Sequence, residues 1–407
     1  MMQFTHLVVI ISFSTLCLAL ALVPDRTHEL AARAICTPTS GGSAATDDTP
    51  AIEAAIQSCG AGGTIIIPAG KTYYLNSQLT FAGCANCDFQ LEGTLKFTSS
   101  TTYWNGKSYM IYIKGITKAS FRSLTGTGLI DGNGQDSWDL FATNSSYARP
   151  TGLRISGSTG ITVSGFKVQN TPSGWLSVEG ASVDTSISNI GFSCVSKSST
   201  SPKNTDGYDI GESTYTTMSN IVVNNQDDCV AFKPGANYVS INTISCNGSH
   251  GISVGSLGQT VGQTDSVTNV YVKNAAMSNS AKSVGIKIWP GQYGSAIVRN
   301  VTWDTVTVDN DDYAAEIQQC YGVSAASTDC LNNPSTASIT DVYFKNFQGT
   351  TSKKYEPVVA NLDCPGNGTC DIYFSSFVIN PPSGTAEFLC ANIDSTPGIT
   401  CTSGANG

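Results

Sequence analysis

Three carboxylates and one imidazole recur at nearly constant spacing in the middle of the chain. Asp206 and Asp227 are 21 residues apart, and Asp228 and His250 are 22 residues apart. Carboxyl groups held close together divide their protons unequally, because the charge on one raises the pKa of its neighbour. One group can then stay protonated and act as a general acid while another acts as a general base. The spacing therefore predicts a proton-transfer site.

Four short motifs carry these residues together with other polar side chains. Taken singly, each has an ordinary structural explanation: adjacent aspartates as a turn, a lone histidine as a hydrogen-bonding group, a lysine as part of the surface. Their joint recurrence favours one shared site. In chain order the motifs are Asn204-Thr205-Asp206, Gln226-Asp227-Asp228-Cys229, Gly248-Ser249-His250-Gly251 and Gly285-Ile286-Lys287.

The interval between the motifs suits the coils of a solenoid, in which matching positions lie on neighbouring rungs. Rungs about 4.8 Å apart would place carboxylates one or two rungs distant within the roughly 6.5–9.5 Å that admits a water beside a scissile glycosidic bond, which favours inversion. Neighbouring residues of an ideal strand face opposite sides. Asp227 and Asp228 can therefore reach one cleft only if the backbone bends there.

The apolar pattern predicts the elements that position the motifs. Residues 49–60 predict one helix, with Thr49 as its cap and Gly60 as its stop. After this helix the apolar period is two, beginning with a strand over 64–67. Similar short runs follow near residues 189, 220, 269, 300, 341 and 371, with an intermediate copy at 239–241.

Such a weak repeat of short strands with Asn-rich corners predicts one all-β domain, a parallel β-helix with a short N-terminal capping helix. A β-propeller is the second possibility, although its blades need regular periods of about 40 to 45 residues. Composition agrees with an all-β chain: 40 glycines and only 13% charged residues argue against a helical bundle. The net charge of -9 gives no indication of binding to nucleic acid or to an anionic membrane.

The N-terminus and the cysteines indicate export. Residues 1–21 are predicted to be a secretory signal peptide, and residues 22–35 a pro-segment or linker before a domain at 36–407. The protein is therefore expected to be extracellular. Most of the 13 later cysteines fall into locally spaced pairs, which predicts disulfides and leaves one thiol free, expected at Cys194. Glycosylation is predicted at four sequons: Asn144, Asn247, Asn300 and Asn367.

A metal site is the alternative explanation for one cysteine pair. Cys84 and Cys87 have the spacing of zinc ligands, but no second cysteine pair or histidine lies near them in the sequence. We therefore expect neither a metal nor another cofactor.

The four motifs, in this order, resemble family 28 of the glycoside hydrolases, the polygalacturonase family. The resemblance extends over nearly all of the chain after Cys36. It implies a right-handed parallel β-helix that hydrolyses galacturonan with inversion and without a metal. It also implies that Asp227 is the proton donor, that Asp206 and Asp228 activate the water, and that His250 supports the acid.

Further site residues follow from the same resemblance. Asn204, Lys287 and Tyr321 would bind substrate, with Lys287 facing a uronate carboxylate. Cys229 and Cys246 would form a disulfide between the strand of the acid and that of the histidine.

One departure from the family pattern bears on specificity. Most polygalacturonases have Arg-Ile-Lys where this chain has Gly285-Ile286-Lys287. Loss of the arginine removes a bidentate carboxylate clamp, and we expect it to vacate volume beside the reacting sugar. Segments 227–235 and 248–258 resemble the fungal branch that contains exopolygalacturonases and xylogalacturonan hydrolases. We therefore predict a secreted, monomeric enzyme that cuts α-1,4 bonds in xylose-substituted galacturonan, a pectic polysaccharide.

Three alternatives stay open at this point. An exopolygalacturonase would release single galacturonates from chain ends. A pectate lyase would share the fold but use Ca²⁺ and form unsaturated products. A non-catalytic wall-binding solenoid would bind pectin without releasing reducing ends.

Overall fold

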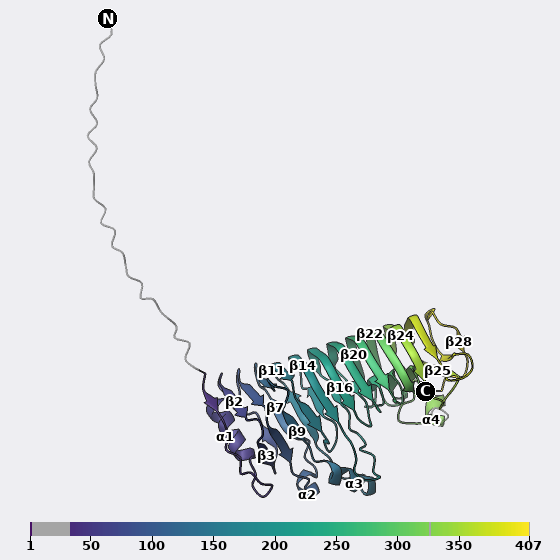
Figure 1. Cartoon of the computed structure of the whole chain (residues 1–407). Helices are drawn as coiled ribbons and strands as arrows, with labels where there is room; N and C mark the ends of the chain where they lie inside the picture. The colour runs from purple at the N-terminus through teal and green to yellow at the C-terminus, as the bar shows by residue number, and fades with distance from the viewer. Residues whose placement is uncertain (2–32, 325–326, 407) are drawn as a thin grey trace. The chain divides into compact units, whose positions relative to one another are not determined.

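The computed structural model describes residue 1, residues 33–324 and residues 327–406. The predicted signal peptide at 1–21 and the predicted pro-segment or linker at 22–35 lie almost entirely outside these residues. Ala34–Gly407 forms one compact unit, a solenoid of short strands stacked coil on coil (Figure 1). The unit is an all-β right-handed parallel β-helix, which confirms the predicted fold class.

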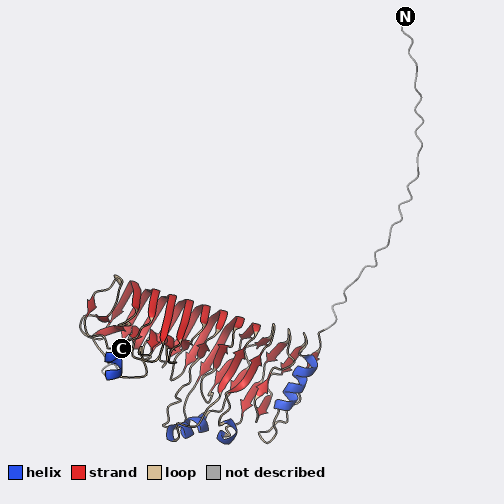
Figure 2. Cartoon of the chain, turned by 180° about the vertical axis from the view of Figure 1, so that it is seen from behind, coloured by secondary structure: helices blue, strands red, loops and turns tan. Residues whose placement is uncertain are grey.

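Two long sheets run along the solenoid, and their strands pair in parallel (Figure 2). The first sheet has 16 strands: β1 (Ile35–Cys36), β2 (Thr64–Ile67), β3 (Thr72–Leu75), β5 (Asp88–Leu91), β6 (Thr94–Phe97), β8 (Ser120–Arg122), β9 (Leu129–Asp131), β11 (Thr159–Ser164), β12 (Lys167–Gln169), β14 (Ser182–Ser193), β16 (Ser213–Asn224), β18 (Ala236–Asn247), β20 (Thr264–Ser278), β22 (Ser295–Asp311), β24 (Ser338–Thr351) and β26 (Thr369–Asn380).

The second sheet has 12 strands and carries the candidate site. Its members are β4 (Leu79–Thr80), β7 (Tyr109–Lys114), β10 (Thr151–Ser156), β13 (Leu176–Glu179), β15 (Tyr208–Ile210), β17 (Val230–Phe232), β19 (Ile252–Leu257), β21 (Val284–Ile288), β23 (Ala315–Gln318), β25 (Val358–Asp363), β27 (Glu387–Ala391) and β28 (Cys401–Thr402).

Side chains that point into the solenoid form its core. In β2 and β3, buried and half-buried residues alternate, because successive side chains of a strand face opposite sides. Stacked coils bring like residues together: the ring of Phe121 contacts those of Phe81, Phe89 and Phe166, with centroids 4.9–5.4 Å apart. Burial of these aromatic columns stabilises the stacking of one coil on the next.

Helix α1 (Thr49–Cys59) covers the N-terminal end of the solenoid, as predicted. Its Ile52 and Ile56 are fully buried, and Cys59 is disulfide-bonded to Cys36 of β1. The expected cap is wrong by one residue, because Asp48 precedes the helix and Thr49 already belongs to it. The other helices lie in loops on one side of the body (Figures 1 and 2): α2 (Thr101–Trp104), α3 (Gln135–Thr143) and α4 (Thr328–Asn332).

The predicted strand repeat contains two separate corners. Asn189 and Asn220 are hydrogen-bonded to each other at 3.1 Å, and both have positive φ, which asparagine tolerates well. The register places Asn269 five residues before this corner, in a ladder with Asn300 at 2.7 Å. The long step from 220 to 269 in the sequence pattern therefore joins two corners of the coil, which short-range similarity could not distinguish.

Six disulfides lie along the described chain, and they include the predicted Cys229–Cys246 bond. Cys84 and Cys87 bond to each other, which excludes them as zinc ligands in this state. Among the cysteines that the structure describes, Cys194 is the free one, as expected. The remaining bonds are Cys36–Cys59, Cys320–Cys330, Cys364–Cys370 and Cys390–Cys401. Among the described residues, none of the helices has the length and apolar character to cross a membrane.

Candidate active site

The candidate residues lie where the chain enters successive strands of the second sheet. The first residues of β15, β17, β19 and β21 are paired in register. Asp206, Asp228 and His250 each stand two residues before one of these first residues, and Lys282 holds the same position before β21. The β-helix therefore places four chemically active side chains on four successive rungs.

The backbone bends at Gln226 and Asp227, as the approach of two adjacent aspartates to one cleft requires. One carboxylate oxygen from each of Asp206, Asp227 and Asp228 lies within 4.8 Å of the other two. The acids thus converge, but these oxygens are closer than the separation predicted from rung spacing. The distance between the carboxylates therefore does not by itself support inversion.

Asp228 is the most enclosed of the three acids. Its Oδ2 lies 2.5 Å from Nζ of Lys287, and its Oδ1 accepts a hydrogen bond from Ser253 Oγ at 3.1 Å. Burial alone would lower the pKa of Lys287, but the adjacent Asp228 carboxylate outweighs it and raises that pKa. Lys287 therefore stays charged, and it neutralises Asp228 in the free protein in addition to its predicted contact with substrate.

Asp227 faces His250 and Asn204. His250 Nδ1 lies 3.2 Å from Asp227 Oδ1, and Asn204 Nδ2 donates to Oδ2 at 3.3 Å. Burial alone would raise the pKa of Asp227, but the hydrogen bond and charge of His250, together with the Asp228 N–H, lower it. In the free protein Asp227 is therefore the acid that gives up its proton readily.

The pKa of Asp206 is shifted in the opposite direction from that of Asp227. Burial raises its pKa well above the ordinary value, and repulsion by Asp209, Asp227 and Asp228 adds to the effect. The Lys233 ammonium, 3.9 Å from Asp206 and 3.3 Å from Asp209, offsets only part of it. Asp206 therefore holds its proton to a higher pH than an ordinary aspartate does.

Tyr321 follows β23 and lies beside the ammonium group of Lys287. Lys287 Nζ is 5.2 Å from the centre of its ring, which also contacts Trp289. A cation held over an aromatic ring is stabilised by the electrons of the ring face. Lys287 and the predicted sugar-binding Tyr321 thus lie together on the later rungs of the site.

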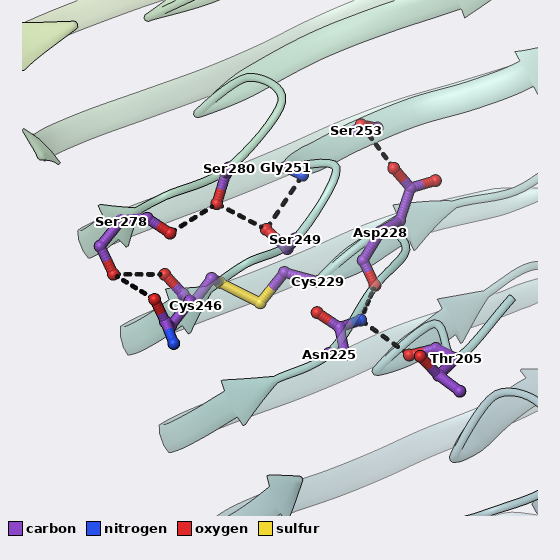
Figure 3. The surroundings of a disulfide bond; sticks show 11 residues. Thr205, Asn225, Asp228, Cys229, Cys246, Ser249, Gly251, Ser253, Ser278 and Ser280 are labelled. Atoms are coloured by element: carbon purple, nitrogen blue, oxygen red, sulfur yellow. Dashed lines mark hydrogen bonds between the residues drawn. A yellow bond between two sulfur atoms is a disulfide. The ribbon is translucent and has the colours of Figure 1, made fainter. Parts of the chain in front are cut away.

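The Cys229–Cys246 disulfide and the buried Asn225 lie next to Asp228 (Figure 3). The disulfide joins Cys229, the residue after Asp228, to Cys246 near the end of β18. Buried Asn225 donates to the carbonyl oxygens of Thr205 at 2.7 Å and Asp228 at 2.9 Å. These bonds fix the two acid-bearing turns relative to each other.

Three residues that the sequence analysis did not select complete the site. Lys233 and Ser253 lie within the segments that resemble the family. As polar residues close to the motifs, they could have been identified from the sequence. Arg149 was not identifiable in this way: it comes from a distant loop and donates to Asn204 Oδ1 at 2.7 Å. Only the folded chain brings that loop to the acids.

The structure corrects the expectation that Gly285 leaves empty space. A β-carbon at Gly285 would lie 2.7 Å from Cδ of Lys282 and 2.7 Å from the carbonyl oxygen of Glu316. The stem of Lys282 therefore crosses the position that an arginine would occupy in most polygalacturonases. The prediction of vacant volume is wrong, because the side chain of Lys282, three residues earlier in the chain, fills the space.

A pocket beside the acids is lined by residues that include Arg154, Glu179 and Lys233, the last of which is 3.9 Å from Asp206. A second pocket lies further along the solenoid, where Gln319 and Asp363 meet the C-terminal Ala405 and Asn406. Burial raises the pKa of Asp363 to about 6.

The three acids are also close enough to share a divalent cation. Lys287 and Lys233, however, already supply positive charge to Asp228 and Asp206. Lysine ammonium groups beside the carboxylates disfavour a second cation at the same place. The charge balance therefore favours chemistry by the side chains alone.

Comparison with known proteins identifies the family and relatives of the chain. The sequence profile of "Glycosyl hydrolases family 28" matches residues 59–401. The chain is 54% identical over 378 residues to endo-xylogalacturonan hydrolase A of Aspergillus tubingensis, covering 92% of each chain. The crystal structure of the A. tubingensis enzyme superposes with a TM-score of 0.90 over 92% of this chain and 100% of that one. Endopolygalacturonase I of Stereum purpureum, 23% identical, shares the fold with a TM-score of 0.64 over 88% of this chain and 100% of its own.

Proposed function

The chain belongs to glycosyl hydrolase family 28, and from this premise we propose that it is an endo-acting hydrolase of xylose-substituted galacturonan. The convergence of Asp206, Asp227, Asp228 and His250 on one sheet face carries the hydrolytic part of this proposal. Similarity over the whole length of an endo-xylogalacturonan hydrolase supports the substrate. The endo-acting activity in the name of that relative supports cleavage within the polymer.

We assign roles from the position of each group. Asp227 donates a proton to the glycosidic oxygen, and His250, 3.2 Å away, replaces that proton or holds the carboxyl in place. Asp206 and Asp228 orient and deprotonate the attacking water, and the reaction inverts the anomeric centre. Asn204, Lys287 and Tyr321 hold the sugars on either side of the bond.

A second assignment is favoured by the protonation of the free protein. The raised pKa of Asp206 and the lowered pKa of Asp227 suit Asp206 as the acid and Asp227 as the base. Asn variants of each residue separate the two assignments on an aryl glycoside of a galacturonate trimer. A good leaving group needs little acid assistance, so the variant that lacks the acid keeps activity on this substrate and the variant that lacks the base loses it.

The substrate proposal is tested by the initial rates of release of reducing ends from two polymers. We expect faster release from xylogalacturonan than from unsubstituted polygalacturonate, with and without a chelator. Equal or inverted rates would remove the preference for xylose-substituted substrate. Activity lost in chelator, with products that absorb in the ultraviolet, would indicate the lyase instead.

We also propose that the protein is secreted and acts as a monomer. Six disulfides suit an oxidising compartment. The proposed signal peptide at 1–21 and the domain at 36–407 are checked by N-terminal sequencing of the secreted protein. Its mass in solution checks the monomer.

A further inference from the structure

Lys282 and Glu316 form an ion pair on the outer face of the second sheet. Lys282 Nζ lies 3.0 Å from Glu316 Oε2, and the two side chains are only 7% and 12% exposed. Such pairs are costly to desolvate, and loss of one partner leaves an uncompensated charge. No role assigned above requires this pair, so its place beside the site needs an explanation.

The register places the pair next to the acids. Gly285 pairs with Ser253 on one side and with Glu316 on the other. Ser253 in turn hydrogen-bonds to Asp228. The stem of Lys282 covers Gly285, and its Cγ lies 3.1 Å from where a β-carbon on Gly251, the residue after His250, would be. Lys282 therefore lies two rungs from Asp228, and Glu316 lies three rungs from it.

The charges of the pair cancel beside Gly285, where most polygalacturonases carry an arginine. A carboxylate that leaves water is stabilised by a nearby unpaired ammonium or guanidinium group. Here the Lys282 ammonium is held by Glu316, and the neighbouring Lys287 is held by Asp228. Both cations of this stretch are thus already neutralised before substrate binds.

We propose that the Lys282–Glu316 pair weakens the hold of the site on galacturonate carboxylates by filling the space above Gly285 while withholding a free cation there. This inference deepens the proposed function and rests on it: bare and xylosylated galacturonate both keep their carboxylates, so weak binding of these groups makes affinity depend more on contacts with the xylose substituents. The shape of Lys282 closes the position, and the carboxylate of Glu316 cancels its charge.

Binding of unsubstituted trigalacturonate tests the inference without relying on turnover. Asp227→Asn serves as the background that prevents hydrolysis, and calorimetry gives the affinity. Adding Glu316→Gln frees the Lys282 ammonium at nearly unchanged shape, and we expect about tenfold tighter binding, since one charged hydrogen bond is worth that much. Raising the salt concentration should reduce the gain.

Two further variants separate charge from shape and from net charge. Lys282→Met with Glu316→Gln keeps the shape without either charge and should bind as the background does. Asp312→Asn frees Lys354, which lies 2.7 Å from Asp312 and is 56% exposed. This variant changes the net charge as Glu316→Gln does, and we expect it to leave the affinity for trigalacturonate unchanged.

Unchanged trigalacturonate affinity in Glu316→Gln, with only a lower melting temperature, would show that the pair is structural and would overturn the inference. Equal tightening in Asp312→Asn would overturn it as well, because net charge would then be the cause. The wild-type rates on the two polymers test the proposed function separately. If the proposed function fails that test, the trigalacturonate affinities still show whether the Lys282–Glu316 pair weakens binding.

Discussion

His250 and Asp227 are directly joined: Nδ1 of the imidazole lies 3.2 Å from Oδ1 of the carboxylate. The His250 side chain is 50% exposed, whereas that of Asp227 is 18% exposed, so the contact links solvent to the enclosed acid cluster. A proton can therefore reach Asp227 through the imidazole. This relationship supports the assignment of Asp227 as the proton donor.

Replacement of that donor should abolish most turnover without unfolding the protein. Asp227→Asn keeps the size of the side chain, and we expect kcat on xylogalacturonan to fall by about a hundred- to ten-thousand-fold, the usual value of general acid assistance. Asp184→Asn, on an exposed corner of β14, is the matched control and should leave kcat unchanged. Near-normal turnover in Asp227→Asn would remove Asp227 from the mechanism.

Lys287 should contribute to stability as well as to binding. Lys287→Met leaves the Asp228 carboxylate buried without its ammonium partner, 2.5 Å away in the wild type. Loss of one partner of a buried pair costs about 3–5 kcal/mol of unfolding free energy. Denaturant unfolding measures the change. The control Lys96→Met breaks a looser pair with Asp131 at 3.8 Å, in which the lysine side chain is 41% exposed, and should cost less than about 1 kcal/mol. Equal losses in the two variants would contradict the strong coupling of Lys287 to Asp228.

The protonation of Asp206 makes stability depend on pH in a defined direction. An aspartate titrates near pH 3.9 in an unfolded chain, and the folded pKa of Asp206 is well above that value. Between these two values the folded state binds more protons, so its stability falls as pH rises. Asp206→Asn removes the titrating carboxyl group and therefore this loss of stability at higher pH.

The melting temperature of Asp206→Asn relative to wild type should therefore increase from pH 4 to pH 7. Differential scanning calorimetry at the two values measures the change, with Asp184→Asn as the exposed control. A relative melting temperature that decreases over this interval would mean that the pKa of Asp206 is lowered in the folded protein.

Cys194 should be the one thiol of the secreted protein, and it should be inert. Burial raises its pKa to about 12, so the thiolate that reacts with alkylating agents is scarce at neutral pH. Mass spectrometry after treatment with iodoacetamide should show no label on the folded protein and one label after unfolding without reductant. Two or more labels on the unfolded chain would contradict the six disulfides.

The sequence predicted the parts of the site that recur with the coil. The spacing of Asp206, Asp228 and His250 follows one rung per motif, and regular stacking turns that spacing into proximity. The bend at Asp227 was also predictable, because two adjacent aspartates cannot share a cleft on a straight strand.

Features that depend on contacts between different coils could not be predicted in this way. Lys282 crosses Gly285 and meets Glu316, which lies 31 residues after Gly285. Arg149 reaches Asn204 from a loop outside the repeat. The two asparagine corners are similar in local sequence, so only strand register separates them.

Mass spectrometry of xylogalacturonan digested in ¹⁸O-labelled water tests the central claim most directly. Cleavage within the chain by water, catalysed by the acid cluster, should give saturated oligosaccharides of several sugars that retain xylose and carry one ¹⁸O at each new reducing end. Unsaturated products without the label, or galacturonate released one unit at a time, would contradict it.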